Sequence, residues 1–395
     1  MPCPARVSKV LLLSLAVVVF MNSATNSIAN AAEDNDADKM LVFVGTYTSG
    51  PDEGVYTCEL DTKTGALKKL AASGNVKGPS FVAIHPNHKF LYAVSEVADY
   101  KDSNTGAVTS FALDPATGKL TPLNHQSSTS AGPCHLVVDR QGKNVLVANY
   151  GGGTAAVLPI GADGKLAPAS STARLTGSSV NKSRQEAPHA HSINLDAANH
   201  FAFVADLGTD KVMVYRFDPA KGTITPNDPP SVAVEPGSGP RHFTFHPSGN
   251  FAYVINEMAS TITALAYDAV RGTLKPIGTV STLPKDFKGE NTTAEVRAHP
   301  SGKFVYGSNR GHDSIAMFAV DPAKGTLTPI GHQVTGGKTP RNFNIDPDGK
   351  FLLAANQDSD TITVFKVDPQ TGKLEPTAHS IDIPKPVCIR FLKKG

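Results

Sequence analysis

The hydrophobic and polar positions of this chain follow a pattern of short strands that repeats six times. Each copy holds an alternating segment, a polar turn and a second apolar segment, as in SFVAIHPNHKFLYAVSE and HFTFHPSGNFAYVINE. A His or Asp ends each first segment, and these residues recur at intervals of 47 to 57 residues: His85, Asp139, Asp196, His246, His299 and Asp346. A period of this length made only of strands predicts a radial array of small sheets, a β-propeller.

Segments at the two ends of the chain supply one more blade. Each of the six copies continues with a third strand, a hairpin such as DPATGKLTP and a fourth strand. The glycine of this hairpin supplies the positive φ angle that the turn needs, and the proline after the turn suits an outer edge strand. The segments left over are PVCIRFL near the C-terminus and LVFVGTY, GVYTCELD and LKKLAASG near the N-terminus. We therefore expect an all-β, seven-bladed β-propeller whose last blade is closed by the C-terminal strand plus the N-terminal strands.

The start of the chain has the pattern of an export signal. Arg6 and Lys9 flank the start of the apolar run VLLLSLAVVVFM, and Ala29-Asn30-Ala31 has the small residues of a cleavage site. The run is too short for a comfortable membrane span. We expect a signal peptide over 1–31, a disordered leader over 32–40 and a single propeller domain over 41–395. The expected location is periplasmic or extracellular, and an uncleaved signal that anchors the chain is the minor alternative.

Charge and cysteine content exclude some classes of protein. Without residues 1–31 the chain has 35 basic and 35 acidic residues. Such a balance argues against a protein that binds nucleic acid or an anionic membrane. Cys58, Cys134 and Cys388 remain, and their odd number and spacing do not suggest a disulfide framework. We interpret them as small apolar residues.

Comparison of the copies separates architectural positions from positions that are free to differ. His and Asp exchange at the turn after the first strand, where both accept local backbone hydrogen bonds, so we interpret His85, His246 and His299 as structural. The residue after the second strand instead changes from copy to copy: Glu96, Tyr150, Leu207, Glu257, Arg310 and Gln357. Such diversity suits a pocket lining, although a solvated loop would also show it.

The first strand of each copy alternates between an apolar and a polar face. This strand is innermost in a propeller blade, so its polar face should look into the central channel. In an antiparallel blade, the entry to strand one and the exit from strand two lie at the same end. The residues that should surround one mouth are His191, Arg241, Glu257, Arg310 and Arg341.

The residues of this mouth suit acyl-type chemistry on a small anionic substrate. An imidazole can take a proton from water, and a guanidinium can stabilise an oxyanion or bind a carboxylate or phosphate. The segment RQEAPHAHS, residues 184–192, follows a long connection that could fold over the pocket. Its H-x-H pair, His189 and His191, is a weak metal signal, and no further cluster has zinc spacing. We therefore expect neither a metal nor a cofactor.

At these residues the chain resembles the seven-bladed-propeller lactonase family, the group named for 6-phosphogluconolactonase and related to the carboxy-cis,cis-muconate lactonizing enzyme. The resemblance covers essentially the whole mature chain, and its more specific segments are ANYGGG, RQEAPHAHS, GPRHFTFHPSGNFAYVINE and TPRNFNIDPDGKFLLAANQDSD. It implies a metal-free active site at one end of the channel. It also implies catalysis by a His, an Arg, a Glu and a further Arg, which match His191, Arg241, Glu257 and Arg310, with Arg297 as the alternative to Arg310.

The resemblance implies a lactone hydrolase that opens a sugar-type lactone, with water activated by His191 and the oxyanion stabilised by Arg241. We expect these residues to bind the substrate: His135, Arg184, Gln185, His189, His242, Glu295, Arg297, Arg341, Asn356 and Gln357. The expected ligand is a small anionic lactone or sugar acid, and we expect a monomer with no nucleic-acid partner and no membrane span in the mature form. Because phosphosugars are scarce outside cells, a free sugar lactone or a lactone from aromatic degradation is an alternative substrate. The alternative functions are a lactonizing cycloisomerase and a non-catalytic binding or scaffold propeller.

Overall fold

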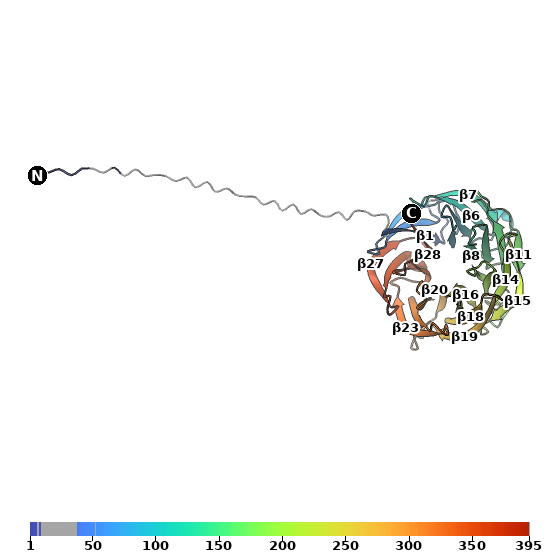
Figure 1. Cartoon of the computed structure of the whole chain (residues 1–395). Helices are drawn as coiled ribbons and strands as arrows, with labels where there is room; N and C mark the ends of the chain where they lie inside the picture. Colours follow the sequence, from blue (N-terminus) through green and yellow to red (C-terminus); the bar gives the residue numbers. More distant parts are fainter. Residues whose placement is uncertain (6–7, 9–37, 52, 395) are drawn as a thin grey trace. The chain divides into compact units, whose positions relative to one another are not determined.

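The computed structural model describes residues 1–5, 8, 38–51 and 53–394 of the chain (Figure 1). The expected signal peptide, apart from residues 1–5 and 8, and most of the expected leader lie outside the described residues. The first strand begins at Lys39, so the last two residues assigned to the leader belong to a sheet. Within the described part of the chain, no helix has the length and apolar character needed to cross a membrane.

Residues 38–51 and 53–394 form seven four-stranded antiparallel sheets arranged as a ring (Figure 1). Blade one comprises β4 (Val82–Ile84), β5 (Phe90–Ser95), β6 (Ala107–Leu113) and β7 (Leu120–Ser127). Blade two comprises β8 (Pro133–Val138), β9 (Asn144–Asn149), β10 (Thr154–Pro159) and β11 (Ser171–Arg174). Blade three comprises β12 (Ala190–Leu195), β13 (Phe201–Asp206), β14 (Lys211–Asp218) and β15 (Thr223–Ala233). Blade four comprises β16 (Pro240–Phe245), β17 (Phe251–Asn256), β18 (Thr261–Asp268) and β19 (Thr273–Ser281).

The remaining blades complete the ring. Blade five comprises β20 (Thr292–Ala298), β21 (Phe304–Arg310), β22 (Ser314–Val320) and β23 (Leu327–Val334). Blade six comprises β24 (Pro340–Ile345), β25 (Phe351–Asn356), β26 (Thr361–Val367) and β27 (Leu374–Asp382). Blade seven comprises β28 (Pro386–Lys393), β1 (Lys39–Thr46), β2 (Tyr56–Asp61) and β3 (Leu67–Ala72). Two short 3₁₀ turns, η2 (Tyr100–Asp102) and η3 (Gln357–Ser359), lie in loops.

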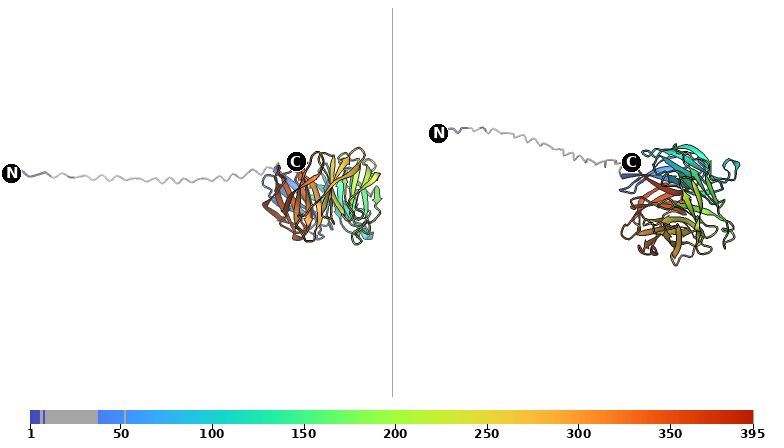
Figure 2. Two further views of the ribbon diagram at one scale, coloured as in Figure 1. Left: turned by 90° about the horizontal axis from the view of Figure 1, so that it is seen from below. Right: turned by 45° about the vertical axis from the view of Figure 1, so that its right-hand side comes forward.

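The two ends of the propeller close the seventh blade, as the sequence predicts. Strand β28 pairs antiparallel with β1, in a register that places Leu41 opposite Leu392 and Val44 opposite Ile389. The innermost strands contact one another around the channel, and the fourth strands form the rim (Figures 1 and 2). The prediction of an all-β, seven-bladed propeller with this closure is confirmed.

Apolar side chains between neighbouring blades form the core, and the hairpin glycine sets how closely the blades approach. Gly325 of blade five has a φ of 70° and lies directly against the ring of Phe251 in blade four. A Cβ at this position would collide with that ring. The Tyr253 hydroxyl donates to the Gly325 carbonyl at 3.1 Å, which adds a hydrogen bond to the apolar contact. The glycine thus serves blade packing as well as the turn.

The recurring histidines after the first strands bind the next blade. In blade four, Nδ1 of His246 accepts the Ser248 backbone N–H, so Nε2 carries the proton and donates to the Gly302 carbonyl at 2.7 Å. His85 and His299 have the same bond to Gly142 and Gly349. Asp346 instead accepts backbone amides of its own turn. These contacts agree with a structural role, but the expectation that His and Asp are interchangeable here is wrong.

Candidate active site

Four side chains reach the mouth of the channel because the inner strands bulge where they begin. Pro240 pairs with Asn256 and His242 pairs with Ile255, so Arg241 is left without a partner in the ladder. The same shift leaves Cys134, His191 and Arg341 unpaired in β8, β12 and β24. An extra residue in one strand turns its side chain away from the regular alternation. The bulges therefore explain why these four side chains meet at one end of the ring.

A cavity of about 360 Å³ lies at this mouth. The residues that line it are Glu96, Cys134, Tyr150, Arg184, His191, Glu257, Thr292, Arg310 and Arg341. A smaller space of about 10 Å³ lies beside it and shares Glu96, Cys134, His191 and Arg341. Arg241 and His242 line only this smaller space. The cavity is large enough for a small molecule, and most of its lining residues carry polar or ionisable groups.

Glu257 is the hub of an ion-pair network in the cavity. Its Oε2 lies 3.0 Å from Nε of Arg241 and 3.0 Å from Nη2 of Arg310, and its Oε1 accepts from Arg184 at 2.7 Å. Burial by itself would raise the pKa of Glu257, but Arg310 and Arg241 outweigh burial and hold this pKa well below its usual range. The Glu257 carboxylate is therefore ionised at neutral pH.

His191 lies beside this carboxylate as a neutral imidazole. Its Nε2 is 3.9 Å from Oε2 of Glu257, and its ring meets Tyr150 and His242 edge to face at centroid distances of 5.3 and 5.4 Å. Burial, with the positive charge of Arg241, lowers the pKa of His191 well below its usual value. The imidazole is therefore free to accept a proton, and Glu257 can stabilise the imidazolium that results.

Two arginines are fixed by backbone carbonyls of one strand. Arg241 Nη1 donates to Ala294 O at 2.7 Å, and Arg310 Nη2 donates to Thr293 O at 2.7 Å. Both carbonyls lie where β20 departs from regular pairing, between Thr293 and Val296. Because their orientation is set by main chain, these guanidinium groups are preorganised toward the cavity and the smaller space beside it.

A second polar cluster accounts for four of the expected substrate-binding residues. Glu295 is buried and interacts through Oε2 with His242 Nδ1 at 3.0 Å and with Arg297 Nη2 at 3.3 Å. The His135 ring lies 5.3 Å from that of His242. The structure places His135, Glu295 and Arg297 outside the lining of both spaces, and His242 lines only the smaller one. His135, His242 and Glu295 are buried on the inner strands, whereas Arg297 is half-buried. Arg297 does not join the Glu257 cluster.

Of the other expected substrate-binding residues, two line the cavity and the rest do not line it. Arg184 and Arg341 line the cavity. Gln185 is buried and donates to Leu207 O at 2.9 Å, which fixes the connection that carries Arg184. The His189 ring stacks on the Tyr150 ring with their centroids 4.5 Å apart. Nδ1 of His189 lies 3.1 Å from the backbone carbonyl oxygen of Tyr150. Asn356 donates to Thr361 within its own turn, and Gln357 donates to Asp358 beside it, so neither lines the cavity.

Several cavity residues were not singled out from the sequence. Glu96 and Tyr150 belong to the diverging position after the second strand, and Cys134 stands at the entry to a first strand, so the sequence held a signal for all three. Tyr47 lines the smaller space from the end of β1. It belongs to the blade built from both chain ends, where the repeat comparison did not extend.

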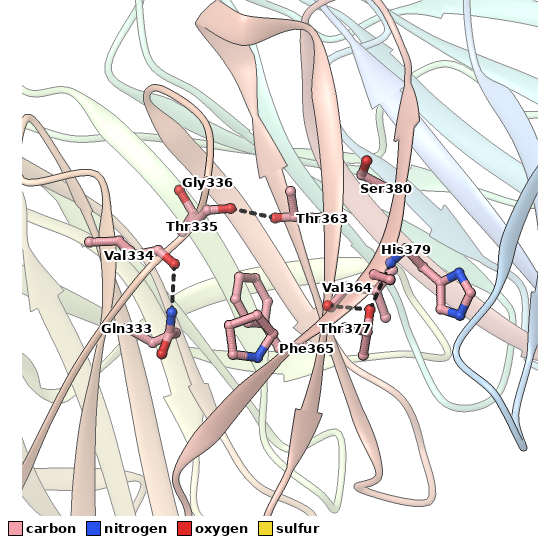
Figure 3. Close-up of a pocket in the computed structure, with 12 residues that line it drawn as sticks. Gln333, Val334, Thr335, Gly336, Thr363, Val364, Phe365, Thr377, His379 and Ser380 are labelled. Atoms are coloured by element: carbon pink, nitrogen blue, oxygen red, sulfur yellow. Dashed lines mark hydrogen bonds between the residues drawn. The ribbon is translucent and has the colours of Figure 1, made fainter.

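Another hollow, of about 260 Å³, lies on the outer strands of blades five and six (Figure 3). It is lined mainly by small and apolar side chains, and the dashed hydrogen bonds join residues of its own wall, such as Thr335 and Thr363. His379 is the one lining residue with an imidazole. The hollow therefore lacks the clustered ionisable groups of the central cavity. Within the described ranges, no three His, Cys, Asp or Glu residues are grouped closely enough to hold a metal ion.

Comparison with known proteins agrees with this architecture. Residues 41–391 match the family model described as lactonase, seven-bladed β-propeller, and the chain belongs to this family. A 6-phosphogluconolactonase of Bacillus subtilis is 37% identical over 354 residues, which are 90% of this chain and 99% of that protein. The membership confirms the predicted enzyme class, a lactone hydrolase.

Solved structures give the same result. The periplasmic gluconolactonase of Pseudomonas aeruginosa is 33% identical, with a TM-score of 0.85 over 90% of this chain and 100% of that chain. A protein of known structure from Bacteroides fragilis is 38% identical, with a TM-score of 0.84 over 90% of this chain and 98% of that chain. The family match over residues 41–391 begins in β1 and ends in β28, the two strands that close the ring.

Proposed function

We propose that this enzyme hydrolyses a small sugar-type lactone at the central cavity by a mechanism that needs no metal. The observation that carries the proposal is the convergence of His191, Glu257 and Arg310 on one cavity of about 360 Å³. A neutral base, an ionised carboxylate beside it and a fixed cation together can promote the addition of water to an ester carbonyl. A scaffold protein has no need of this combination.

Each charged or titratable residue of the site has its own role in the proposed reaction. His191 takes a proton from water as the water oxygen bonds to the lactone carbonyl carbon, and Glu257 stabilises the imidazolium. We assign the oxyanion to Arg310, because its guanidinium lines the cavity and a backbone carbonyl orients it. Arg241 lines only the smaller space and binds Glu257, so we assign it the role of holding that carboxylate in place. This division differs from the expectation that Arg241 binds the oxyanion.

We propose an unphosphorylated sugar lactone as the substrate and a location outside the cytoplasm. The apolar run and the small residues near position 31 support export. The periplasmic gluconolactonase of Pseudomonas aeruginosa, which shares the fold over the whole ring, supports the same assignment. The Bacillus subtilis relative is named for a phosphorylated substrate, so the two substrate classes must be compared directly.

The test is acid release by the purified protein from glucono-δ-lactone, 6-phosphogluconolactone and an aromatic-derived muconolactone, with the spontaneous rate subtracted. Each assay is run before and after dialysis against a strong chelator. We expect glucono-δ-lactone to be hydrolysed with the highest kcat/KM, and we expect the chelator to have no effect. Preference for the phosphorylated lactone would overturn the substrate assignment. Activity that is lost on chelation and restored by zinc or calcium would overturn the metal-free mechanism.

A further inference from the structure

A second carboxyl group lines the catalytic cavity in surroundings opposite to those of Glu257. Glu96 follows β5 of blade one, and its side chain lines both the cavity and the smaller space beside it. Its carboxyl oxygens contact two hydroxyl groups. Tyr47 donates to Oε1 at 3.1 Å, and the Ser80 hydroxyl contacts Oε2. Among the described residues, the Glu96 carboxyl forms no ion pair.

The hydroxyl group of Tyr47 lies between Glu96 and Arg341. Arg341 Nη2 donates to the Tyr47 hydroxyl at 2.9 Å, and its guanidinium lies 5.2 Å from the centre of the Tyr47 ring. Tyr47 therefore accepts from Arg341 and must donate its own proton to Oε1 of Glu96. The Ser80 hydroxyl donates to Oε2 while Glu96 is ionised. The oxygen that can carry a proton is still Oε2, because a hydroxyl group also has acceptor lone pairs and Ser80 can turn to accept from a protonated Glu96. Glu257, by contrast, has three guanidinium groups on its carboxylate.

Two carboxyl groups with opposite surroundings in one cavity are the usual arrangement of an acid and a charge-stabilising group. Lactone hydrolysis needs both a base for water and an acid for the ring oxygen, which would otherwise leave as an alkoxide. Glu257 cannot supply that proton, because its arginine partners keep it ionised. Burial raises the pKa of Glu96, an effect that Ser80, Arg341 and Tyr47 offset only in part. Glu96 is thus the cavity carboxyl suited to hold a proton.

We propose that Glu96 is the general acid of this enzyme and that it protonates the ring oxygen of the lactone. This inference rests on the proposed hydrolase function. The water oxygen bonds to the carbonyl carbon and its proton passes to His191. The bond between that carbon and the ring oxygen then breaks, and the proton on Oε2 of Glu96 passes to the ring oxygen. The carboxyl group of the product returns a proton to Glu96, His191 releases its proton to solvent, and the hydroxy acid leaves as a carboxylate.

The charged and titratable groups around Glu96 come from five blades. Tyr47 and Arg341 come from blades seven and six, Cys134 from blade two, His191 from blade three, and Arg241 and His242 from blade four. The cations among them favour the ionised form of Glu96, and burial opposes them. Because a general acid works only while protonated, loss of the Glu96 proton should set the alkaline limit of kcat.

The test uses Glu96→Gln, which keeps the size of the side chain and an oxygen that can accept from Tyr47. Glu235→Gln, which replaces an exposed carboxyl group away from the cavity, is the matched control. With glucono-δ-lactone, whose leaving group is an alkoxide, we expect kcat of Glu96→Gln to fall by about 100-fold or more. With dihydrocoumarin, whose phenolate leaves without a proton, we expect a loss of less than about 3-fold on the same reasoning. The alkaline limb of the kcat profile should disappear only in Glu96→Gln, and Glu96→Asp, which keeps an acid, should regain part of the rate.

An infrared measurement tests the same claim without a substrate. Near neutral pH, the wild-type protein should show a carboxylic-acid carbonyl band that is absent from Glu96→Gln and unchanged in Glu235→Gln. Equal rate losses on both lactones, or a spectrum without this difference, would overturn the role of Glu96 and leave the hydrolase proposal intact. A wild-type protein that hydrolyses none of the lactones would overturn the hydrolase proposal itself, whatever the infrared result.

Discussion

At the scale of single residues, the cavity is organised by how each charge is paired. Glu257 is surrounded by guanidinium groups and stays ionised, whereas His191 is buried beside Arg241 and stays neutral. Burial alone would favour a protonated Glu257, so its ionised state is due to the arginines around it. Burial also favours a neutral His191, and there the observed state agrees with burial. The pairing therefore prepares a base and its stabilising carboxylate before a substrate enters.

The role assigned to Arg310 predicts a loss confined to catalysis. Arg310→Ala should lower kcat/KM for glucono-δ-lactone by about two to three orders of magnitude, because an oxyanion donor is lost. Arg310→Lys should recover only part of the rate, since an ammonium cannot reproduce the fixed fork. Arg271→Ala, at an exposed arginine of blade four, is the control and should be unaffected. A near-normal kcat/KM in folded Arg310→Ala would rule out this role.

The lowered pKa of His191 predicts a pH profile displaced toward acid. A base is active in its unprotonated form, so a lowered pKa extends activity below the range where an ordinary imidazole, with a pKa of about 6.5, would be protonated. The profile of kcat/KM against pH should therefore stay level through mildly acidic pH and fall only below it. An acid limb centred near the ordinary imidazole pKa would contradict a neutral, desolvated His191.

At the scale of strands and turns, the sequence predicted the ring and the end of the ring that carries the site. Repeat spacing and alternation were sufficient, because each blade buries its apolar residues in the same way. The bulges at Cys134, His191, Arg241 and Arg341 could not be predicted, since alternation assumes regular pairing. Alternation also does not show how deep in the channel a polar side chain lies. The residues of the Glu295 cluster are therefore predicted in the binding site, although most of them lie outside it.

The bond between neighbouring blades predicts that His246→Asp is not neutral. Asp is shorter and cannot donate to the Gly302 carbonyl, so the variant loses an inter-blade hydrogen bond and leaves a half-buried acceptor unpaired. We expect the free energy of unfolding to fall by about 1–3 kcal/mol in chemical denaturation. His88→Asp, at an exposed turn histidine, should change it little. Unchanged stability of His246→Asp would mean that this bond contributes nothing, and activity of the folded variant should remain in either case.

At the scale of the whole molecule, closure of the ring assembles the catalytic cavity. Its lining comes from blades one to six, and Tyr47, which links Arg341 to Glu96, comes from blade seven. Residues at opposite ends of the chain thereby meet around one channel. Repeat comparison could not find Tyr47, because its blade is divided between the two termini. Export and a monomeric state stay predictions.

The buried imidazoles of the channel predict how stability depends on pH. Burial lowers the pKa of His135, His191 and His242, so the unfolded chain binds protons that the folded chain does not. Stability should be greatest above the unfolded imidazole pKa of about 6.5 and should decrease as pH falls, by up to about 1.4 kcal/mol per pH unit for each group. His135→Asn should flatten this dependence in denaturation curves, and His88→Asn should not. Equal slopes for both variants would contradict a neutral channel cluster.

The most direct measurement of whether this cavity is the hydrolytic site compares two histidine variants on one substrate. His191→Ala removes the proposed base, and His200→Ala alters an exposed histidine of the same blade. With both proteins shown to be folded by their melting curves, we expect kcat/KM for glucono-δ-lactone to fall by about two to four orders of magnitude in His191→Ala alone. If His191→Ala hydrolyses the lactone at the wild-type rate, the catalytic site lies elsewhere on this propeller.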